Sequence, residues 1–256
     1  MGFRVLVCSV AIMGLAALAS AASPVQARNR PAATGQVVVV QAVPGAVYAV
    51  SIDGKDVRRD VAVDAVLGPY TLPTGQHRVQ FTESQSNEQV ASTVDVTAGS
   101  SSDVVVHRPA AVDGDPVVNL YRTPRKPIAP GKARVLLAHT ATVAPADVRV
   151  DGQVVFTDIA NGEYATADVA SGTHSVALLP TGVTAHPILG PLSLTLQPST
   201  VTMVYAVGSP SNGSMDVILH DADLTSNGAT APATIDTGSV GLAARIPVSP
   251  FRVATR

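Results

Sequence analysis

The stretch Val50-Ser51-Ile52-Asp53-Gly54 decides the fold, because it occurs a second time as Val148-Arg149-Val150-Asp151-Gly152. In both places apolar residues alternate with other residues, and the run ends in Asp-Gly before another short apolar stretch. Alternation with a period of two is typical of a half-buried strand, and Asp-Gly favours a tight hairpin turn with positive φ. We therefore expect the same β-hairpin twice in one chain.

Three further matches follow in the same order and at nearly the same separation, which predicts two copies of one domain. Val37–Val40 corresponds to Val135–Ala138, Gly75–Phe81 to Gly172–Leu178, and Val118–Leu120 to Val217–Leu219. Each copy has about six or seven short strands, with a turn about every 8 to 12 residues, as in a two-sheet sandwich. We predict an all-β chain of two tandem immunoglobulin-like antiparallel β-sandwich domains, preceded by an N-terminal signal helix.

The composition supports strands and argues against a nucleic-acid partner. Of the residues, 46% are hydrophobic and only 14% are charged, and Val, Ala, Thr, Gly and Pro are abundant. β-Branched side chains suit a pleated sheet, while Gly and Pro interrupt it. The net charge of -2 provides no excess of Lys and Arg that could neutralise phosphates.

The first 27 residues have the pattern of a secretory signal peptide, with Arg4 followed by an apolar run from Val5 to Ala19. We expect cleavage after Ala27; cleavage at Ala21 and retention of the segment as an anchor are the alternatives. The single cysteine, Cys8, lies inside this segment, so the mature chain would contain no disulfide. This pattern predicts a protein that is secreted, extracellular or associated with the cell wall.

The predicted domain boundaries follow from the repeat and from the distribution of proline. We place the first sandwich at residues 35–123 and the second at 132–221, joined by a Pro-rich linker at 124–131. Prolines make such a linker extended and semi-rigid. Residues 222–256 show no sustained period, which predicts a mostly disordered tail without a stable membrane span.

The second copy resembles the DUF4397 family. The resemblance rests on Ala133–His139, on Ala144–Gly152, and on the turn and strand at Ala170–Val176. It is clear over residues 132–221 and weaker over 35–123, where Gln41 replaces His139 and Ala49 replaces Asp147. The family groups bacterial secreted or cell-surface modules of uncharacterised function, often in tandem, so the resemblance implies a surface module.

Three residues are weak candidates for ligand contact: His139, Asp147 and Tyr164. Imidazole and carboxylate suit both acid-base chemistry and metal binding, whereas a tyrosine ring suits a sugar. Because the first copy has Gln and Ala at the first two positions, structural roles are the stronger interpretation. His77 and His174 occur in both copies, and we expect them to be half-buried strand residues with one hydrogen-bonded ring nitrogen.

No motif for a catalytic reaction, a cofactor or a metal is found in the sequence, which predicts a non-enzymatic module without cofactors. The leading hypothesis is an adhesion or spacer unit that contacts an envelope protein or the cell wall. The alternatives are a carbohydrate-binding module with a glycan partner and, less favoured, a hydrolase that uses His139 and Asp147.

Overall fold

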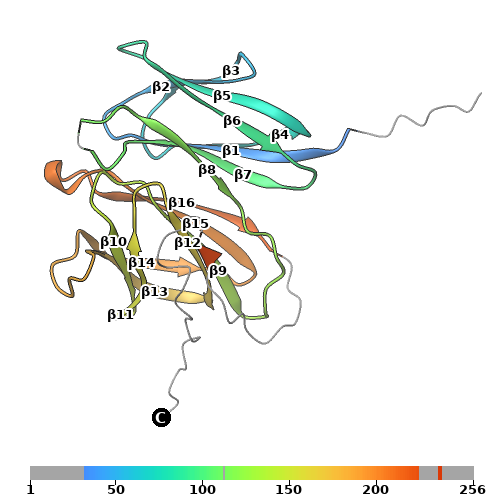
Figure 1. Cartoon of the computed structure of the whole chain (residues 1–256). Coiled ribbons are helices and arrows are strands. Elements are labelled where there is room, and N and C mark those ends of the chain that lie inside the picture. Colours follow the sequence, from blue (N-terminus) through green and yellow to red (C-terminus); the bar gives the residue numbers. More distant parts are fainter. Residues whose placement is uncertain (1–31, 112, 225–235, 238–256) are drawn as a thin grey trace, which may run out of the picture. The chain divides into compact units, whose positions relative to one another are not determined.

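The computed structural model describes residues 32–111, 113–224 and 236–237. Within these ranges the chain consists of β-strands, loops and one short 3-10 helix, Pro210–Asn212. The strands form two groups of sheets with the same internal order (Figure 1). The predicted all-β class with two sandwiches is confirmed, whereas the predicted leader at residues 1–27 lies outside the described residues.

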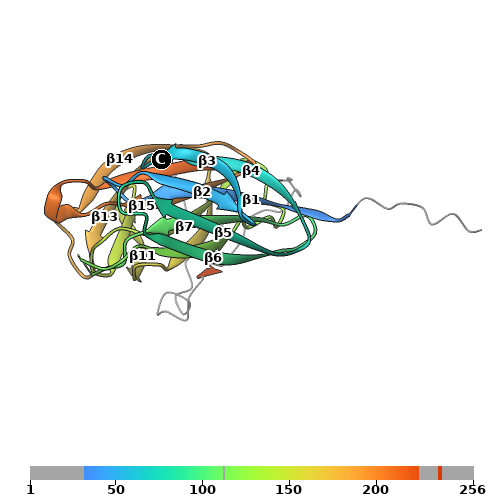
Figure 2. The same ribbon diagram turned by 90° about the horizontal axis from the view of Figure 1, so that it is seen from above.

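Sandwich 1 contains eight strands in two sheets. Its outer sheet has the order β3-β2-β5-β6, and its inner sheet has the order β4-β1-β7-β8. Figure 2 looks onto the outer sheet and shows these four strands running across the view. The strands are β1 (Thr34–Ala42), β2 (Tyr48–Ile52), β3 (Lys55–Val61), β4 (Val66–Pro73), β5 (Gly75–Glu83), β6 (Gln89–Val96), β7 (Ser101–His107) and β8 (Val117–Arg122).

Sandwich 2 has the same strand order, with each strand number increased by eight. Its outer sheet is β11-β10-β13-β14, and its inner sheet is β16-β15-β9-β12-β17, in which β17 adds a short strand to the edge of β12. The strands are β9 (Lys132–His139), β10 (Ala146–Val150), β11 (Gln153–Ile159), β12 (Tyr164–Ala170), β13 (Gly172–Pro180), β14 (Leu189–Leu196), β15 (Thr200–Val207), β16 (Asp216–Asp223) and β17 (Asp236–Thr237).

Each sandwich has one strand more than its hydrophobic pattern indicates. The additional strands are β4 and β12, which occupy the same position in the two inner sheets, beside β1 and β9. In β4 the pair Gly68-Pro69 interrupts the alternation, and a register shift lies between Val37 and Val39 of its partner β1. In β12 small and polar residues replace most of the large apolar ones. Both strands therefore lack the pattern by which the others can be predicted.

Two strand pairs differ from the predicted antiparallel arrangement. β1 pairs with β7 in parallel, and β9 pairs with β15 in parallel. Between the two members of each pair the chain passes through the outer sheet, so the second strand can return in the same direction as the first. Such a long crossover is the connection that parallel neighbours require.

The repeated Asp-Gly turns have the backbone geometry that the sequence predicts. Asp53 and Gly54 have φ values of 51° and 76°, and Asp151 and Gly152 have values of 49° and 84°. Positive φ at both central residues is the condition for the hairpin turn that matches the twist of the strands. The turns join β2 to β3 and β10 to β11.

Each sandwich has its own apolar core between its outer and inner sheets. In sandwich 1 alternate residues of β1 and β7, such as Val39 and Val104, pack against Val50 and Phe81 of the outer sheet. In sandwich 2 the corresponding core contains Leu137 and residues of the outer sheet. No covalent cross-link is available within the described residues, so apolar burial supplies most of the stability.

A third apolar cluster, the shared core, joins the two inner sheets. Along each inner sheet, the side chains that alternate with those of the sandwich's own core point to the opposite face. There Val40 and Val105 of sandwich 1 meet Leu136 and Met203 of sandwich 2. Strands β1, β7, β9 and β15 are consequently buried on both faces along most of their lengths. The two sandwiches are therefore stacked through their inner sheets.

The segment between the sandwiches contributes to the shared core. Ile128 is 1% exposed and packs in the shared core. The guanidinium of Arg134 forms a bidentate ion pair with Asp168 and also donates to the carbonyl of Lys126. Beyond β16, Leu224 is buried in the same cluster. Residues 225–235 and 238–256 of the predicted tail lie outside the described residues.

Because the shared core belongs to both sandwiches, we expect them to unfold together. Leu136→Ala removes a side chain that is 0% exposed, and such truncations cost about 2–5 kcal/mol. Denaturant unfolding should show one transition, shifted equally in far-UV circular dichroism and in tyrosine fluorescence. Leu120→Ala, at a side chain that is 41% exposed, is the control and should shift it little. Two separate transitions in the unaltered protein would contradict the expectation.

Candidate functional site

A buried carboxylate, that of Asp103 on β7, lies at the contact between the sandwiches. Asp103 is 0% exposed, and its Oδ2 accepts a hydrogen bond of 2.5 Å from the hydroxyl of Tyr205. The same oxygen also accepts one from Nε2 of His220. Tyr205 on β15 and His220 on β16 belong to sandwich 2, so both bonds cross from one sandwich to the other. Within the described part of the chain, Asp103 Oδ1 has no hydrogen-bond partner.

Aromatic rings surround this carboxylate. The rings of Tyr205 and His220 are stacked with centroids 6.4 Å apart, and Tyr121 lies 5.6 Å from Tyr205. Tyr164 completes the group with an edge-on contact of 5.7 Å to Tyr121. The predicted ligand-contact residue Tyr164 is thus half-buried and packs against the shared core.

In this network the carboxylate of Asp103 is paired with a phenol and an imidazole beside the apolar side chains of the shared core. Burial, and then the negative charge of Asp103, raise the pKa of Tyr205 well above its usual value. The phenol therefore remains protonated and continues to donate to the carboxylate. His220 is 15% exposed at its side chain and forms the ion pair with Asp103 when its ring is protonated. A buried carboxylate without such partners would be strongly unfavourable.

The repeat does not conserve this network, which is why similarity between the copies could not reveal it. Asp103 pairs with Tyr121 across β7 and β8, and the corresponding pair across β15 and β16 is Met203 with His220. The position of Asp in one sandwich is therefore occupied by Met in the other, and that of Tyr by His. The only sequence signal is this pair of polar substitutions within strands of the same type.

A second polar contact between the sandwiches lies at the turn before β12. The carbonyl of Gly162 accepts hydrogen bonds of 3.2 Å from the Asn119 side chain and from the Tyr121 hydroxyl. Asn161 donates to the carbonyl of Arg108 at 3.1 Å. Gly162 has a φ of +86°, and a Cβ there would lie 2.9 Å from Nδ2 of Asn119. The positive φ thus favours glycine at this turn, and a side chain there would displace the amide of Asn119.

His139 and Asp147, the predicted acid-base candidates, are each held in structural contacts. His139 is 0% exposed, and its Nε2 lies 3.3 Å from the carbonyl of Ala144. Burial lowers the pKa of His139, which favours the neutral ring. The carboxylate of Asp147 accepts backbone N–H bonds of 2.9 Å from Asp158 and from Gly182. Among the described residues no hydrogen bond or ion pair joins His139 to Asp147.

The exchange of His139 for Gln41 between the copies has a structural reason. Gln41 Nε2 donates to the carbonyl of Ala46 at 2.8 Å, five residues along the chain. His139 makes the same contact with Ala144, also five residues along. Either side chain can therefore close the loop that follows the first strand of its sandwich.

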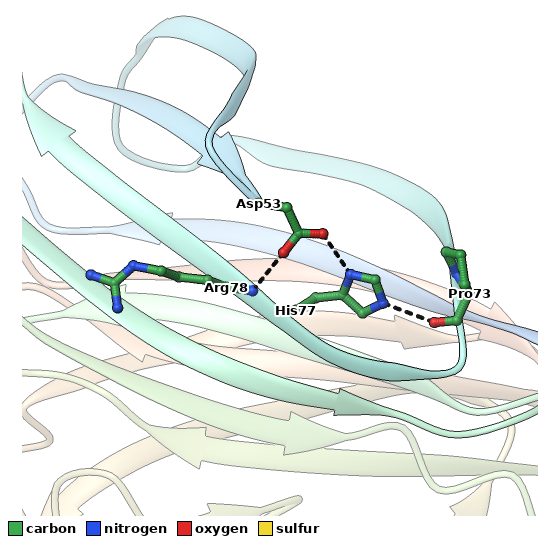
Figure 3. Close-up of polar contacts among 4 residues, drawn as sticks. All are labelled: Asp53, Pro73, His77 and Arg78. Atoms are coloured by element: carbon green, nitrogen blue, oxygen red, sulfur yellow. Dashed lines mark hydrogen bonds and ion pairs between the residues drawn. The ribbon is translucent and has the colours of Figure 1, made fainter.

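His77 anchors the first Asp-Gly turn to the neighbouring strand. Its Nδ1 lies 2.7 Å from Oδ2 of Asp53, and its Nε2 lies 2.9 Å from the carbonyl of Pro73 (Figure 3). The other carboxylate oxygen of Asp53 accepts the backbone N–H of Arg78 at 2.9 Å. Both ring nitrogens thus face acceptors, one more than the sequence led us to expect, and a protonated ring satisfies both.

Sandwich 2 repeats this arrangement around His174. Nδ1 of His174 lies 2.8 Å from Asp151, its Nε2 lies 3.0 Å from the carbonyl of Ala170, and the N–H of Ser175 donates to Asp151 at 2.8 Å. We refer to the two groups as the His-Asp brackets. Since each bracket fixes a hairpin to the next strand, these histidines have structural roles.

The hydrogen bond between Asp53 and His77 changes the acidity of both groups. It raises the pKa of His77 and lowers that of Asp53, whose carboxylate also accepts the N–H of Arg78. Both shifts favour the charged pair at mildly acidic pH. This makes the bracket a pH-dependent element of the fold.

The described residues contain no group of three or more His, Cys, Asp or Glu side chains that could hold a metal ion. No helix found in the same ranges is long and apolar enough to cross a membrane.

The fold and its contacts define a class of protein: two β-sandwiches with the same order of eight strands, stacked through a shared core. In a comparison with known families, residues 35–146 match the model of DUF4397, described as a domain of unknown function. This match covers sandwich 1, β9 and the first residue of β10. The match is to the predicted family, but it falls on the copy for which the sequence shows the weaker resemblance. It does not extend over the rest of sandwich 2, where the resemblance rests on the motifs at Ala144–Gly152 and Ala170–Val176.

No curated protein matches the chain. Among solved structures, one similar chain is described as "a putative cell adhesion protein from Bacteroides eggerthii DSM 20697". It is 11% identical, the alignment covers 77% of this chain and 98% of that one, and the TM-score is 0.18.

Tyr205→Phe tests the buried network because it removes one of the two donors to Asp103 and leaves the ring packing intact. Hydrogen bonds to charged groups contribute about 1.5–3 kcal/mol, so we expect a loss of stability in that range, measured by denaturant unfolding. Tyr70→Phe is the matched control, since the Tyr70 hydroxyl forms no hydrogen bond within the described residues, and it should be nearly neutral. Equal effects of the two substitutions would show that the network is not stabilising.

Asp53→Asn tests the first His-Asp bracket. The folded pKa of His77 is raised, so its contribution is present below the unfolded value of about 6.5 and is lost as pH rises through the folded pKa. The lowered pKa of Asp53 adds a contribution present above about 3.9 and lost as pH falls. The stability difference from the unaltered protein should therefore be largest between about pH 4 and 6.5.

The His77 titration, followed by NMR, should move to a lower pKa in this variant. Asp56→Asn is the control, because Asp56 pairs with Arg59 and not with a histidine. An unchanged titration of His77 in Asp53→Asn would refute the role of the hydrogen bond.

Proposed function

We propose that the chain is a non-enzymatic module of the cell envelope or the extracellular space, acting as an adhesion or spacer unit toward a protein or cell-wall partner. The observation that carries this proposal is the shared core. It stacks two cysteine-free sandwiches, with the buried strands β1, β7, β9 and β15 at the centre. Such a stack resists bending at the junction, which suits a unit that holds partners at a fixed separation.

The state of the polar side chains supports a non-enzymatic role. Asp103 is buried in the network with Tyr205 and His220, while His139 and Asp147 hold backbone groups. A catalytic acid or base must reach a substrate, whereas Asp103 and His139 are 0% exposed and Asp147 is 6% exposed. The strand edges and the outer sheets then remain as surfaces for binding.

The carbohydrate-binding alternative has less support from the positions of the rings. Tyr48, Tyr121 and Tyr205 are at most 2% exposed. Tyr70 and Tyr164 are half-buried and pack against apolar clusters. Stacking on a sugar needs an accessible ring face, and none of the aromatic residues within the described ranges belongs to the exposed class.

A fractionation and binding experiment tests the proposal. The purified chain without residues 1–27 is mixed with wall, membrane and medium fractions of the native cell, and the bound amount is measured. We expect saturable binding to one fraction. Prior treatment of that fraction with protease or with a wall hydrolase distinguishes a protein from a wall partner. Absence of binding to all fractions, or turnover of a component by the chain, would overturn the proposal.

A further inference from the structure

We propose that the free edge of β16 is a docking site for an extended, basic polypeptide strand that inserts one aliphatic side chain between the sheets of sandwich 2. This inference rests on the proposed function and specifies the kind of partner. It follows from the pairing of the edges, from a small apolar pocket and from the charges beside it.

β16 is the most regular unpaired edge of its sheet. It pairs with β15 without a register shift from Asp216 to Asp223, and no strand of the described residues pairs with its other side. The opposite edge of the same sheet carries β17. In sandwich 1 the edge strand β4 contains a shifted register and Pro69, which has no N–H to donate. A partner strand can thus add to β16 with continuous main-chain pairing.

Beside this edge, the core of sandwich 2 is open to an apolar pocket. The pocket has a volume of about 30 Å³ and is lined only by Leu, Val and Ala, among them Val217 of β16 and Leu189 and Leu192 of β14. Leu219 follows Val217 on the same face of β16 and is 42% exposed. The pocket and Leu219 together form an apolar site along the edge.

At the corresponding edge of sandwich 1 there is a pocket of about 220 Å³, but its lining includes the charged residues Glu83, Glu88 and Asp115, and the apolar core beneath is covered. Val118, which occupies the position of Val217, packs against the core of sandwich 1, and β6 lies in contact with β8. Val79 is 0% exposed there, whereas its counterpart Val176 in sandwich 2 is only half-buried and lines the pocket. The opening is therefore a feature of the second copy and does not follow from the repeated fold.

The charges along β16 indicate a basic partner. Asp216, Asp221 and Asp223 are exposed on this strand. Partial burial, and then the nearby Asp216, raise the pKa of Asp64, so the acidic surface includes a residue of sandwich 1. Arg or Lys side chains of an added strand would neutralise these carboxylates, which speeds association and favours partners of that charge.

The size of the pocket limits the anchor to a small aliphatic group. The pocket has a volume of only about 30 Å³, and its apolar lining gives a water molecule no hydrogen bonds. The tip of a Val or Leu side chain can fill it and cover Leu219 with its remaining methyl groups. A Trp ring cannot enter without displacing the strands.

Synthetic ten-residue peptides test the proposal with the chain lacking residues 1–27. They carry Val, Leu and two Arg at alternate positions, so that one face of the added strand meets Val217, Leu219, Asp221 and Asp223. Calorimetry should detect binding, and Leu219→Ser should weaken it about tenfold. The matched control is Leu120→Ser, because Leu120 occupies the same position in sandwich 1 and is 41% exposed; it should leave the affinity unchanged. Replacing Asp216 and Asp223 by Asn should reduce the salt dependence of binding.

Two further peptides distinguish strand addition from attraction between charges. A peptide methylated on alternate backbone nitrogens and one with Asp in place of Arg should both fail to bind. Equal binding of the methylated peptide, or equal effects of the two serine substitutions, would overturn the proposal. Envelope binding that is insensitive to Leu219→Ser would leave the proposed function intact and reject this edge as the docking site. Peptide binding without binding to any envelope fraction would support this edge and reject the proposed function.

Discussion

The burial of both faces of β1, β7, β9 and β15 is the constraint on which the structure depends. A strand in an ordinary sandwich needs one apolar face, but these four must satisfy two cores at once. Their sequences accordingly contain nearly continuous apolar runs, as in Val37–Val40 and Val201–Val207. The same strands form the two parallel pairs, so the crossover connections and the stacking of the sandwiches have a common origin.

The Asp103 network places a polar requirement inside an otherwise apolar contact. Apolar surfaces attract each other without direction, whereas a buried carboxylate is stable only where its donors meet it. Tyr205 and His220 meet Asp103 in a single alignment of the two inner sheets. In the other sandwich, Met203 stands at the position of Asp103, and Tyr121 stands at the position of His220. Two identical copies could therefore not form the same contact. We infer that the network fixes how the inner sheets of the two different sandwiches are aligned against each other.

The sequence was informative wherever structure is local or repeated, and uninformative where the copies meet. The turns at Asp53-Gly54 and Asp151-Gly152 could be predicted because their chemistry is local. Strands β4 and β12 were missed because Gly68-Pro69 and small residues remove the alternation. The partners of Asp103 lie about a hundred positions away in sequence, and no periodicity reports such a contact. His139 appeared as a candidate by residue type, but the loop that it closes is visible only in three dimensions.

The two sandwiches have equivalent edge strands, but the charges and the packing around these strands differ. The central strands β1, β7, β9 and β15 could not change freely, because nearly all of their residues are buried. The last strands were less restricted: Leu120 and Leu219 keep the same exposure, but only the second copy has the pocket and the row of carboxylates beside its leucine. An outer strand such as β16 can thus carry a distinct surface without loss of the fold, because exposed side chains such as Leu219, unlike Ile218, do not belong to the shared core.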